Sequence, residues 1–126
     1  MKRVLTIVAV MVASDLAVSA TGKVEASASV RGPDNSTWAP DGSLLVASIR
    51  AAGSEDFAVC NPLPRGACPI PFAIVAVDPA TMQARDLYAV GGAPMGAGTV
   101  GLQVGSALFV GSFAGDRVLR VDLEAD

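Results

Sequence analysis

Asp34 and Asn35 are the neighbouring residues whose types could do chemistry in this chain. A carboxylate and an amide carbonyl are hard oxygen donors of the kind that calcium prefers. The chain has no His, so the commonest general base and the commonest transition-metal ligand are both missing. Any chemistry must therefore use carboxylates, amides, hydroxyls or an oxygen-bound cation. The stretch 32–35 is also ordinary turn sequence, and that alternative stays open.

Other motifs give no catalytic or cofactor-binding residue. Ser48, Ser106 and Ser112 have no Gly-x-Ser-x-Gly setting and no His partner. The glycine-rich stretch 91–98 lacks the Gly-Lys-Ser/Thr ending of a phosphate-binding loop and leads toward a strand, so it is interpreted as a connector. The nine basic residues are scattered and the net charge is −3, which argues against binding to nucleic acid or to an anionic membrane.

The N-terminal twenty residues have the order of a secretory signal peptide. Lys2 and Arg3 precede an apolar run over 4–13, and the small residues 18–20 resemble a cleavage site. This predicts a signal-like helix over 1–20 and export to the periplasm or the extracellular space. The apolar run is too short for a permanent membrane span, which needs roughly 20 residues. Asp15 is unusual in a signal peptide, and a buried strand or a start created by upstream truncation are the alternatives.

The two cysteines favour a disulfide. Cys60 and Cys68 bracket a Pro- and Gly-rich stretch, and their spacing does not fit a CxxC redox or zinc motif. In an oxidising compartment they would close this loop and stabilise the fold by roughly 2 to 3 kcal/mol. Two free thiols are the alternative.

Short apolar runs separated by turn residues predict an all-β fold beyond residue 33. A hairpin around the Asp41-Gly42 turn is followed by a connection over 49–70, which is long enough to be either a functional insertion or a mobile loop. Two further strands complete a four-stranded meander, and three more strands follow the glycine-rich connector. The predicted strands are 36–38, 43–48, 72–77, 84–89, 99–104, 107–111 and 117–121.

The two meanders resemble each other in sequence. When residues 37–48 are aligned with residues 100–111, each stretch contains a strand, a glycine turn and an apolar strand that ends in a small residue. Discounting the long connection, the repeat is about 40 to 45 residues, the length of a four-stranded propeller blade. The prediction is a partial β-propeller of about one and three-quarter four-stranded blades. Its expected parts are the signal peptide 1–20, a linker or extra strand over 21–33, a blade over 34–90 with insertion 49–70, and an incomplete last blade over 91–126.

The stretches 34–47, 98–113 and 118–121 resemble the last two blades of six-bladed calcium-dependent propeller hydrolases. These are the paraoxonase/arylesterase and gluconolactonase-like superfamily, which includes senescence marker protein and luciferin-regenerating enzyme relatives. The resemblance implies that Asp34 and Asn35 descend from ligands of a calcium ion in the central channel. It also implies a small ester or lactone substrate for the intact family, whose catalytic histidines would lie in blades absent from this chain.

Two functions follow from this resemblance and from the open sheet edges. Calcium takes six to eight oxygen ligands, and two cannot hold it, so the chain is expected to bind no calcium and to be inactive alone. The first function is therefore a truncated calcium-dependent lactonase or arylesterase-like protein. The second is a non-catalytic exported binding module that self-associates, because unpaired strands are templates for pairing.

Overall fold

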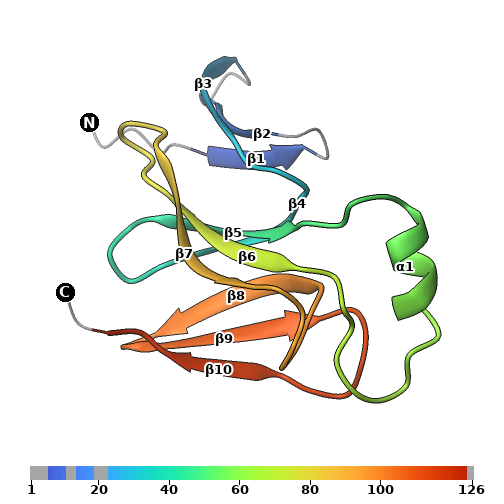
Figure 1. The fold of residues 1–126 in the computed structure, drawn as a ribbon. Helices are drawn as coiled ribbons and strands as arrows, with labels where there is room; N and C mark the ends of the chain where they lie inside the picture. Colours follow the sequence, from blue (N-terminus) through green and yellow to red (C-terminus); the bar gives the residue numbers. More distant parts are fainter. Residues whose placement is uncertain (1–5, 11–13, 19–22, 125–126) are drawn as a thin grey trace.

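Three antiparallel sheets lie one after another along the chain, and a short helix projects from one side (Figure 1). The computed structural model describes residues 6–10, 14–18 and 23–124. We call the sheets the N-terminal sheet (β1–β2–β3), the central sheet (β4–β5–β6–β7) and the C-terminal sheet (β8–β9–β10). The elements are β1 Thr6–Val10, β2 Ser14–Val18, β3 Val24–Ser29, β4 Pro33–Trp38, β5 Leu44–Ile49, α1 Glu55–Cys60, β6 Phe72–Val77, β7 Ala84–Val90, β8 Gly98–Val104, β9 Ala107–Ser112 and β10 Leu119–Asp122.

The predicted all-β class and the strand positions from β4 onward are confirmed. The central sheet is a meander in chain order, as a four-stranded blade would be, and the C-terminal sheet has three strands. Gly42 adopts a φ of 88°, the positive value that the Asp41-Gly42 turn requires. Asp41 accepts a hydrogen bond from the Ser43 amide at 2.9 Å, which closes this turn and lowers the pKa of its carboxyl.

The central sheet is covered on both faces, which explains its nearly continuous apolar strands. All six residues of β6 are buried, as are five of the six in β5. We call the face of each sheet toward the preceding sheet its N-side face, and the opposite one its C-side face. The N-side face of the central sheet packs on the end of β3, through Leu44, Val46, Ala73, Val75 and Val77 against Ala28 and Val30. Its C-side face packs on the C-terminal sheet, through Leu45, Ala47, Phe72, Ile74 and Ala76 against Leu108 and Val110.

Glycines bring β8 close to the central sheet. A Cβ on Gly101 would lie 2.9 Å from Cγ2 of Ile74, and one on Gly98 would lie 2.5 Å from the ring of Phe72. Side chains at these positions would separate the two sheets, so the absence of a Cβ is what permits the close packing.

The expected N-terminal helix is not found among the described residues of 1–20. Thr6–Val10 and Ser14–Val18 instead form β1 and β2, which pair with β3. The segment 21–33, expected as a linker or an extra strand, contains the strand β3. The short apolar run that indicated a helix also suits strand pairing, because periodicity alone does not separate the two over so few residues. No helix in the described residues is long and apolar enough to cross a membrane.

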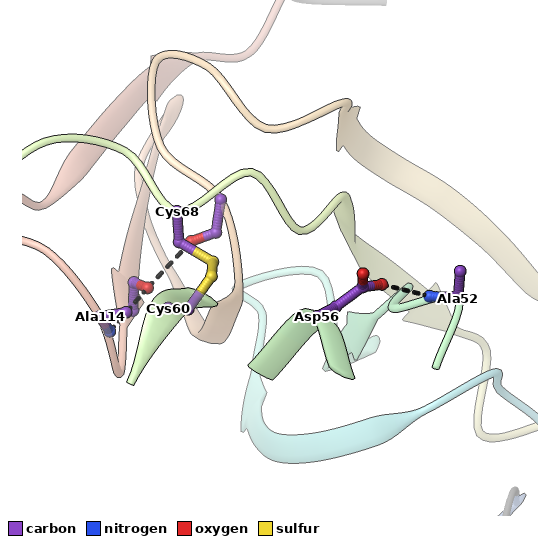
Figure 2. The surroundings of a disulfide bond; sticks show 7 residues. Ala52, Asp56, Cys60, Cys68 and Ala114 are labelled. Atoms are coloured by element: carbon purple, nitrogen blue, oxygen red, sulfur yellow. Dashed lines mark hydrogen bonds between the residues drawn. A yellow bond between two sulfur atoms is a disulfide. The ribbon is translucent and has the colours of Figure 1, made fainter. Parts of the chain in front are cut away.

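The insertion 49–70 is packed against the C-terminal sheet and contains a helix that the sequence analysis did not predict. Cys60 and Cys68 form the expected disulfide and are completely buried (Figure 2). Phe57 of α1 stacks on Phe113 with ring centroids 5.9 Å apart, and the Gly115 amide donates to the Leu63 carbonyl at 3.2 Å. The insertion therefore joins the end of β5 to the β9–β10 turn.

The repeat exists in three dimensions, but its register differs by one residue from the sequence comparison. Leu44 pairs with Val77 as Leu108 pairs with Val121, and Val46 pairs with Val75 as Val110 pairs with Leu119. Leu108 thus corresponds to Leu44 rather than to Leu45. The β4–β5 turn, counted between the paired residues Trp38 and Leu44, is one residue longer than the β8–β9 turn, counted between the equivalent pair Gln103 and Leu108. This extra residue produces the shift.

With this register, both sheets have the same orientation in the stack. Leu44 and Val46 face the N-terminal sheet, and their counterparts Leu108 and Val110 face the central sheet. A β-bulge also recurs near the start of β4 and of β8. Equivalent residues of the two sheets therefore point the same way along the chain.

One serine hydrogen bond recurs at the end of the second strand in both sheets. The Ser48 hydroxyl donates to the Arg31 carbonyl just before β4, and the Ser112 hydroxyl donates to the Gly96 carbonyl, at 2.9 Å, just before β8. Each bond fixes the chain where it enters its sheet.

We predict that Ser48→Ala and Ser112→Ala each lower the free energy of unfolding by about 1 to 3 kcal/mol, because each leaves a carbonyl without its partner. Urea unfolding followed by circular dichroism measures this. Ser106→Ala, at an exposed turn, is the matched control and should change stability by less than about 0.5 kcal/mol. A negligible loss of stability in all three variants would show that the Ser48 and Ser112 hydrogen bonds do not stabilise the two sheets.

Replacing both Cys60 and Cys68 with alanine is expected to lower stability by about 2 to 3 kcal/mol, because the open loop gains freedom in the unfolded chain. Chemical unfolding of the oxidised and the doubly substituted protein measures the difference. A stability that is the same with and without the bridge would contradict this prediction.

Candidate functional site

Asp34 and Asn35 lie at the bulge near the start of β4, on the edge of the central sheet. The register shifts between Pro33 and Ser36, so the strand bends where these two residues stand. Bulges re-aim side chains and are frequent next to functional sites. The sequence-predicted metal residues thus occupy a position suited to directing side chains away from the regular strand.

Asn35 points toward the C-terminal sheet. Its side-chain Nδ2 donates to the carbonyl of Thr99 on β8 at 2.9 Å. Two residues further along β4, the Thr37 hydroxyl donates to the carbonyl of Gly101. These side chains therefore connect the first strands of the two sheets, and the amide nitrogen of Asn35 is used for this contact.

Asp34 is half-buried, and no hydrogen bond or ion pair to its carboxylate is found within the described residues. Removal from water without a compensating partner disfavours the charged form, and this desolvation raises the pKa of Asp34. The charge of Asp34 at neutral pH therefore destabilises the folded protein.

The described residues do not fit a calcium ion at this place. Asp34 and the free Oδ1 of Asn35 are two oxygens, whereas calcium takes six to eight. In the described ranges, no three His, Cys, Asp or Glu side chains lie close enough together to hold a metal ion. No catalytic step through calcium is therefore derived for this chain.

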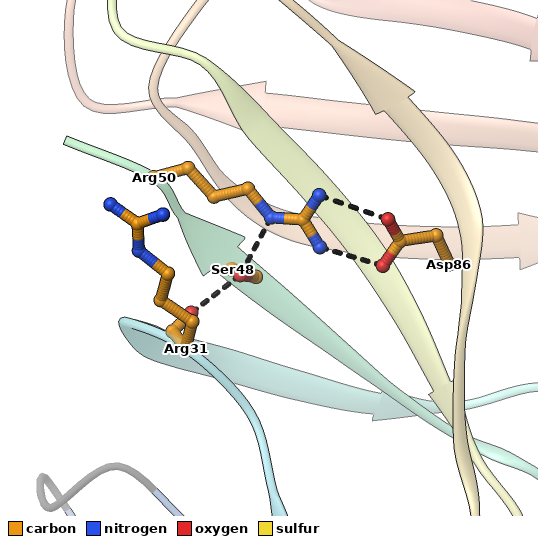
Figure 3. A network of polar contacts seen from close by, with 4 residues as sticks. All are labelled: Arg31, Ser48, Arg50 and Asp86. Carbon is orange, nitrogen blue, oxygen red and sulfur yellow. Dashed lines mark hydrogen bonds and ion pairs between the residues drawn. The ribbon is translucent and has the colours of Figure 1, made fainter. Parts of the chain in front are cut away.

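A second polar cluster, which the sequence analysis missed, lies on the N-side face of the central sheet, between the end of β5 and the first half of β7 (Figure 3). Arg50 makes a two-pronged ion pair with Asp86, with distances of 2.9 and 2.6 Å, and its Nε donates to the Ser48 hydroxyl at 3.4 Å. Arg50 follows β5 and Asp86 lies on β7, so the pair spans β6. The spacing of the two residues in the sequence gives no signal of this contact.

This cluster borders an open cleft of about 170 Å³ that also contains Arg31 and Arg85. Arginines suit the oxygens of a carboxylate or a phosphate. Here, however, Arg50 is occupied by Asp86, and Arg31 donates to the Ala51 carbonyl at 3.1 Å. The Arg50–Asp86 pair is also partly exposed, so it contributes under about 1 kcal/mol to the free energy of unfolding. It acts mainly as a link between strands.

Comparison of the chain with protein-family models, curated proteins and solved structures finds no match. The arguments about function therefore rest on the residues and their geometry.

Asp34→Asn is expected to raise the thermal unfolding midpoint at pH 7 by a few degrees at most, because it removes a charge that burial disfavours. The pKa of Asp34 is raised in the fold, so its destabilising effect is present at neutral pH and disappears as the pH falls through that pKa. The variant and the wild type should therefore converge near pH 3. Differential scanning fluorimetry at both pH values measures this, with exposed Glu124→Gln as the control. A lower midpoint for Asp34→Asn at pH 7 would show that the carboxylate makes a favourable contact.

Proposed function

We propose that this chain is a section of a β-propeller related to the calcium-dependent lactonases and arylesterases, and that it performs no hydrolysis by itself. The observation that supports the proposal best is the common orientation of the central and C-terminal sheets. Leu44 and Leu108 point toward the preceding sheet in each case. The neighbouring positions of β4 and β8, joined through Asn35 and Thr37, also suit the inner strands of adjacent blades.

The absence of histidine supports the second part of the proposal, that the chain performs no hydrolysis by itself. Ester or lactone hydrolysis in the family that the sequence resembles depends on calcium and histidine, and the chain has no His. In a complete site, the calcium ion would polarise a carbonyl and stabilise the developing oxyanion. Asn35 and Thr37 here hold two sheets together instead, so their role is structural.

Export belongs to the same proposal. The buried Cys60–Cys68 bridge supports it, because disulfides persist mainly in oxidising compartments. Cell fractionation with thiol labelling tests this: the protein should be found outside the cytoplasm with both cysteines oxidised. A cytoplasmic protein with two reactive thiols would contradict export.

The purified chain is expected to show no ester or lactone hydrolysis above the no-enzyme rate with phenyl acetate or a γ-lactone, with or without millimolar calcium. Calcium should also leave its thermal unfolding midpoint unchanged, because two oxygens cannot hold the ion. Asp34→Asn is the matched variant. Hydrolysis that persists on repurification, or a calcium-dependent rise in the midpoint that Asp34→Asn abolishes, would overturn the proposal.

A further inference from the structure

The C-side face of the C-terminal sheet is exposed and mostly apolar. Leu108 of β9 packs on the central sheet, so its neighbours Ala107 and Phe109 point the opposite way. Phe109 pairs with Leu102 of β8, and their exposed fractions are 37% and 49%. Val104, which pairs with Ala107, is 59% exposed. Three large apolar side chains therefore lie in water on one side of a single sheet.

Cross-strand pairing arranges this surface in two rows. The edge strand β10 places Arg120 beside Phe109 and Asp122 beside Ala107. Arg120 and Asp122 also form an ion pair with each other at 2.7 Å, and both are more than half exposed. We call the two rows together the open face; they are Leu102–Phe109–Arg120 and Val104–Ala107–Asp122.

The two rows of the open face complement each other in charge and in size. Consider a half-turn about an axis that lies parallel to the sheet, runs across its strands and passes midway between the rows. This half-turn lays each row of one copy over the other row of a second copy. Arg120 then lies over the second copy's Asp122, and the large Phe109 lies over its small Ala107. Opposite charges and complementary volumes therefore meet at every position of the two outer strands and the middle one.

The described residues favour this arrangement over others. A half-turn about an axis along the strands would lay β8 over β10, so Leu102 and Val104 would face Arg120 and Asp122. The N-side face of the C-terminal sheet and both faces of the central sheet already contribute to buried clusters within the described part of the chain. The open face is therefore matched best by the same face of another copy.

From this self-complementarity we infer that the open face binds the open face of a second copy of this chain in a twofold-symmetric dimer. Two sheets that pack face to face in this way form a sandwich. The contact uses the same surface on both copies, so it closes at two copies and does not continue as a filament. Each copy contributes only one three-stranded sheet, so the dimer is expected to be weak and to depend on concentration. The inference goes beyond the proposed function and does not depend on the propeller relationship.

Light scattering coupled to size-exclusion chromatography of the full chain measures the dimer. The mass should approach twice the 12.7 kDa of one chain as the concentration rises through the micromolar range, and it should rise no further. Phe109→Asp should keep the far-ultraviolet circular dichroism of a β protein and have the mass of one copy. Val59→Asp is the matched control, because Val59 is 58% exposed on α1, and it should dimerise like the wild type.

Charge reversal tests the predicted pairing between copies. Arg120→Asp and Asp122→Arg should each weaken the dimer by about tenfold in dissociation constant, because like charges then face each other across the contact. An equimolar mixture of the two variants should recover the two-copy mass, because opposite charges meet again. The ion pair within one copy cannot produce this recovery. A mixture that is no more dimeric than its components would overturn the inference.

Cross-linking gives a further measurement in which the apolar side chains stay intact. Ala107→Cys should form a covalent dimer with a short bismaleimide, because the twofold axis passes near this position, and the native cysteines are buried in their disulfide. Thr81→Cys, at the exposed β6–β7 turn, is the control and should stay uncross-linked. A wild type with the mass of one copy at every concentration, or a mass that grows beyond two copies, would overturn the inference. A two-copy wild type in which Ala107→Cys does not cross-link would overturn it as well.

Discussion

Burial of the central sheet on both of its faces is the constraint on which the rest of the structure depends. β5 and β6 have apolar side chains pointing both ways, and neither set is stable in water without a covering layer. Each large aliphatic side chain contributes about 1.5 to 3 kcal/mol when fully buried. On the N-side face these side chains pack on Ala28 and Val30 at the end of β3, and on the C-side face they pack on the C-terminal sheet.

The same constraint explains the polar features around the stack. Asn35 and Thr37 connect β4 to β8, Ser48 and Ser112 fix the entry of the chain into two sheets, and the Arg50–Asp86 pair spans β6. All of these contacts set how sheets and strands lie relative to one another.

Much of the fold was predictable from the sequence, because turn residues separate the apolar runs clearly. The strand 72–77 and the Asp41-Gly42 turn were predicted as they are found. Helix α1 was not, since its six residues are too few to show a helical period and depend on packing of Phe57 and Cys60. The repeat was predicted one residue out of register, because a turn that is longer by one residue leaves the sequence pattern almost unchanged while it reverses the face of each side chain. The candidate site could be located by residue type, but the contact of Asn35 with Thr99 depends on packing between sheets that are distant in sequence.

The common orientation of successive sheets is tested most directly by nuclear Overhauser contacts of the Ile74 methyl groups. Ile74 lies on the C-side face, where a Cβ on Gly101 would come within 2.9 Å of its Cγ2. The account predicts strong contacts between the Ile74 methyls and the α-protons of Gly101, together with contacts between Val46 and Val30 on the other face. Contacts from the Ile74 methyls to Val30 instead would reverse the faces of the central sheet and contradict the account.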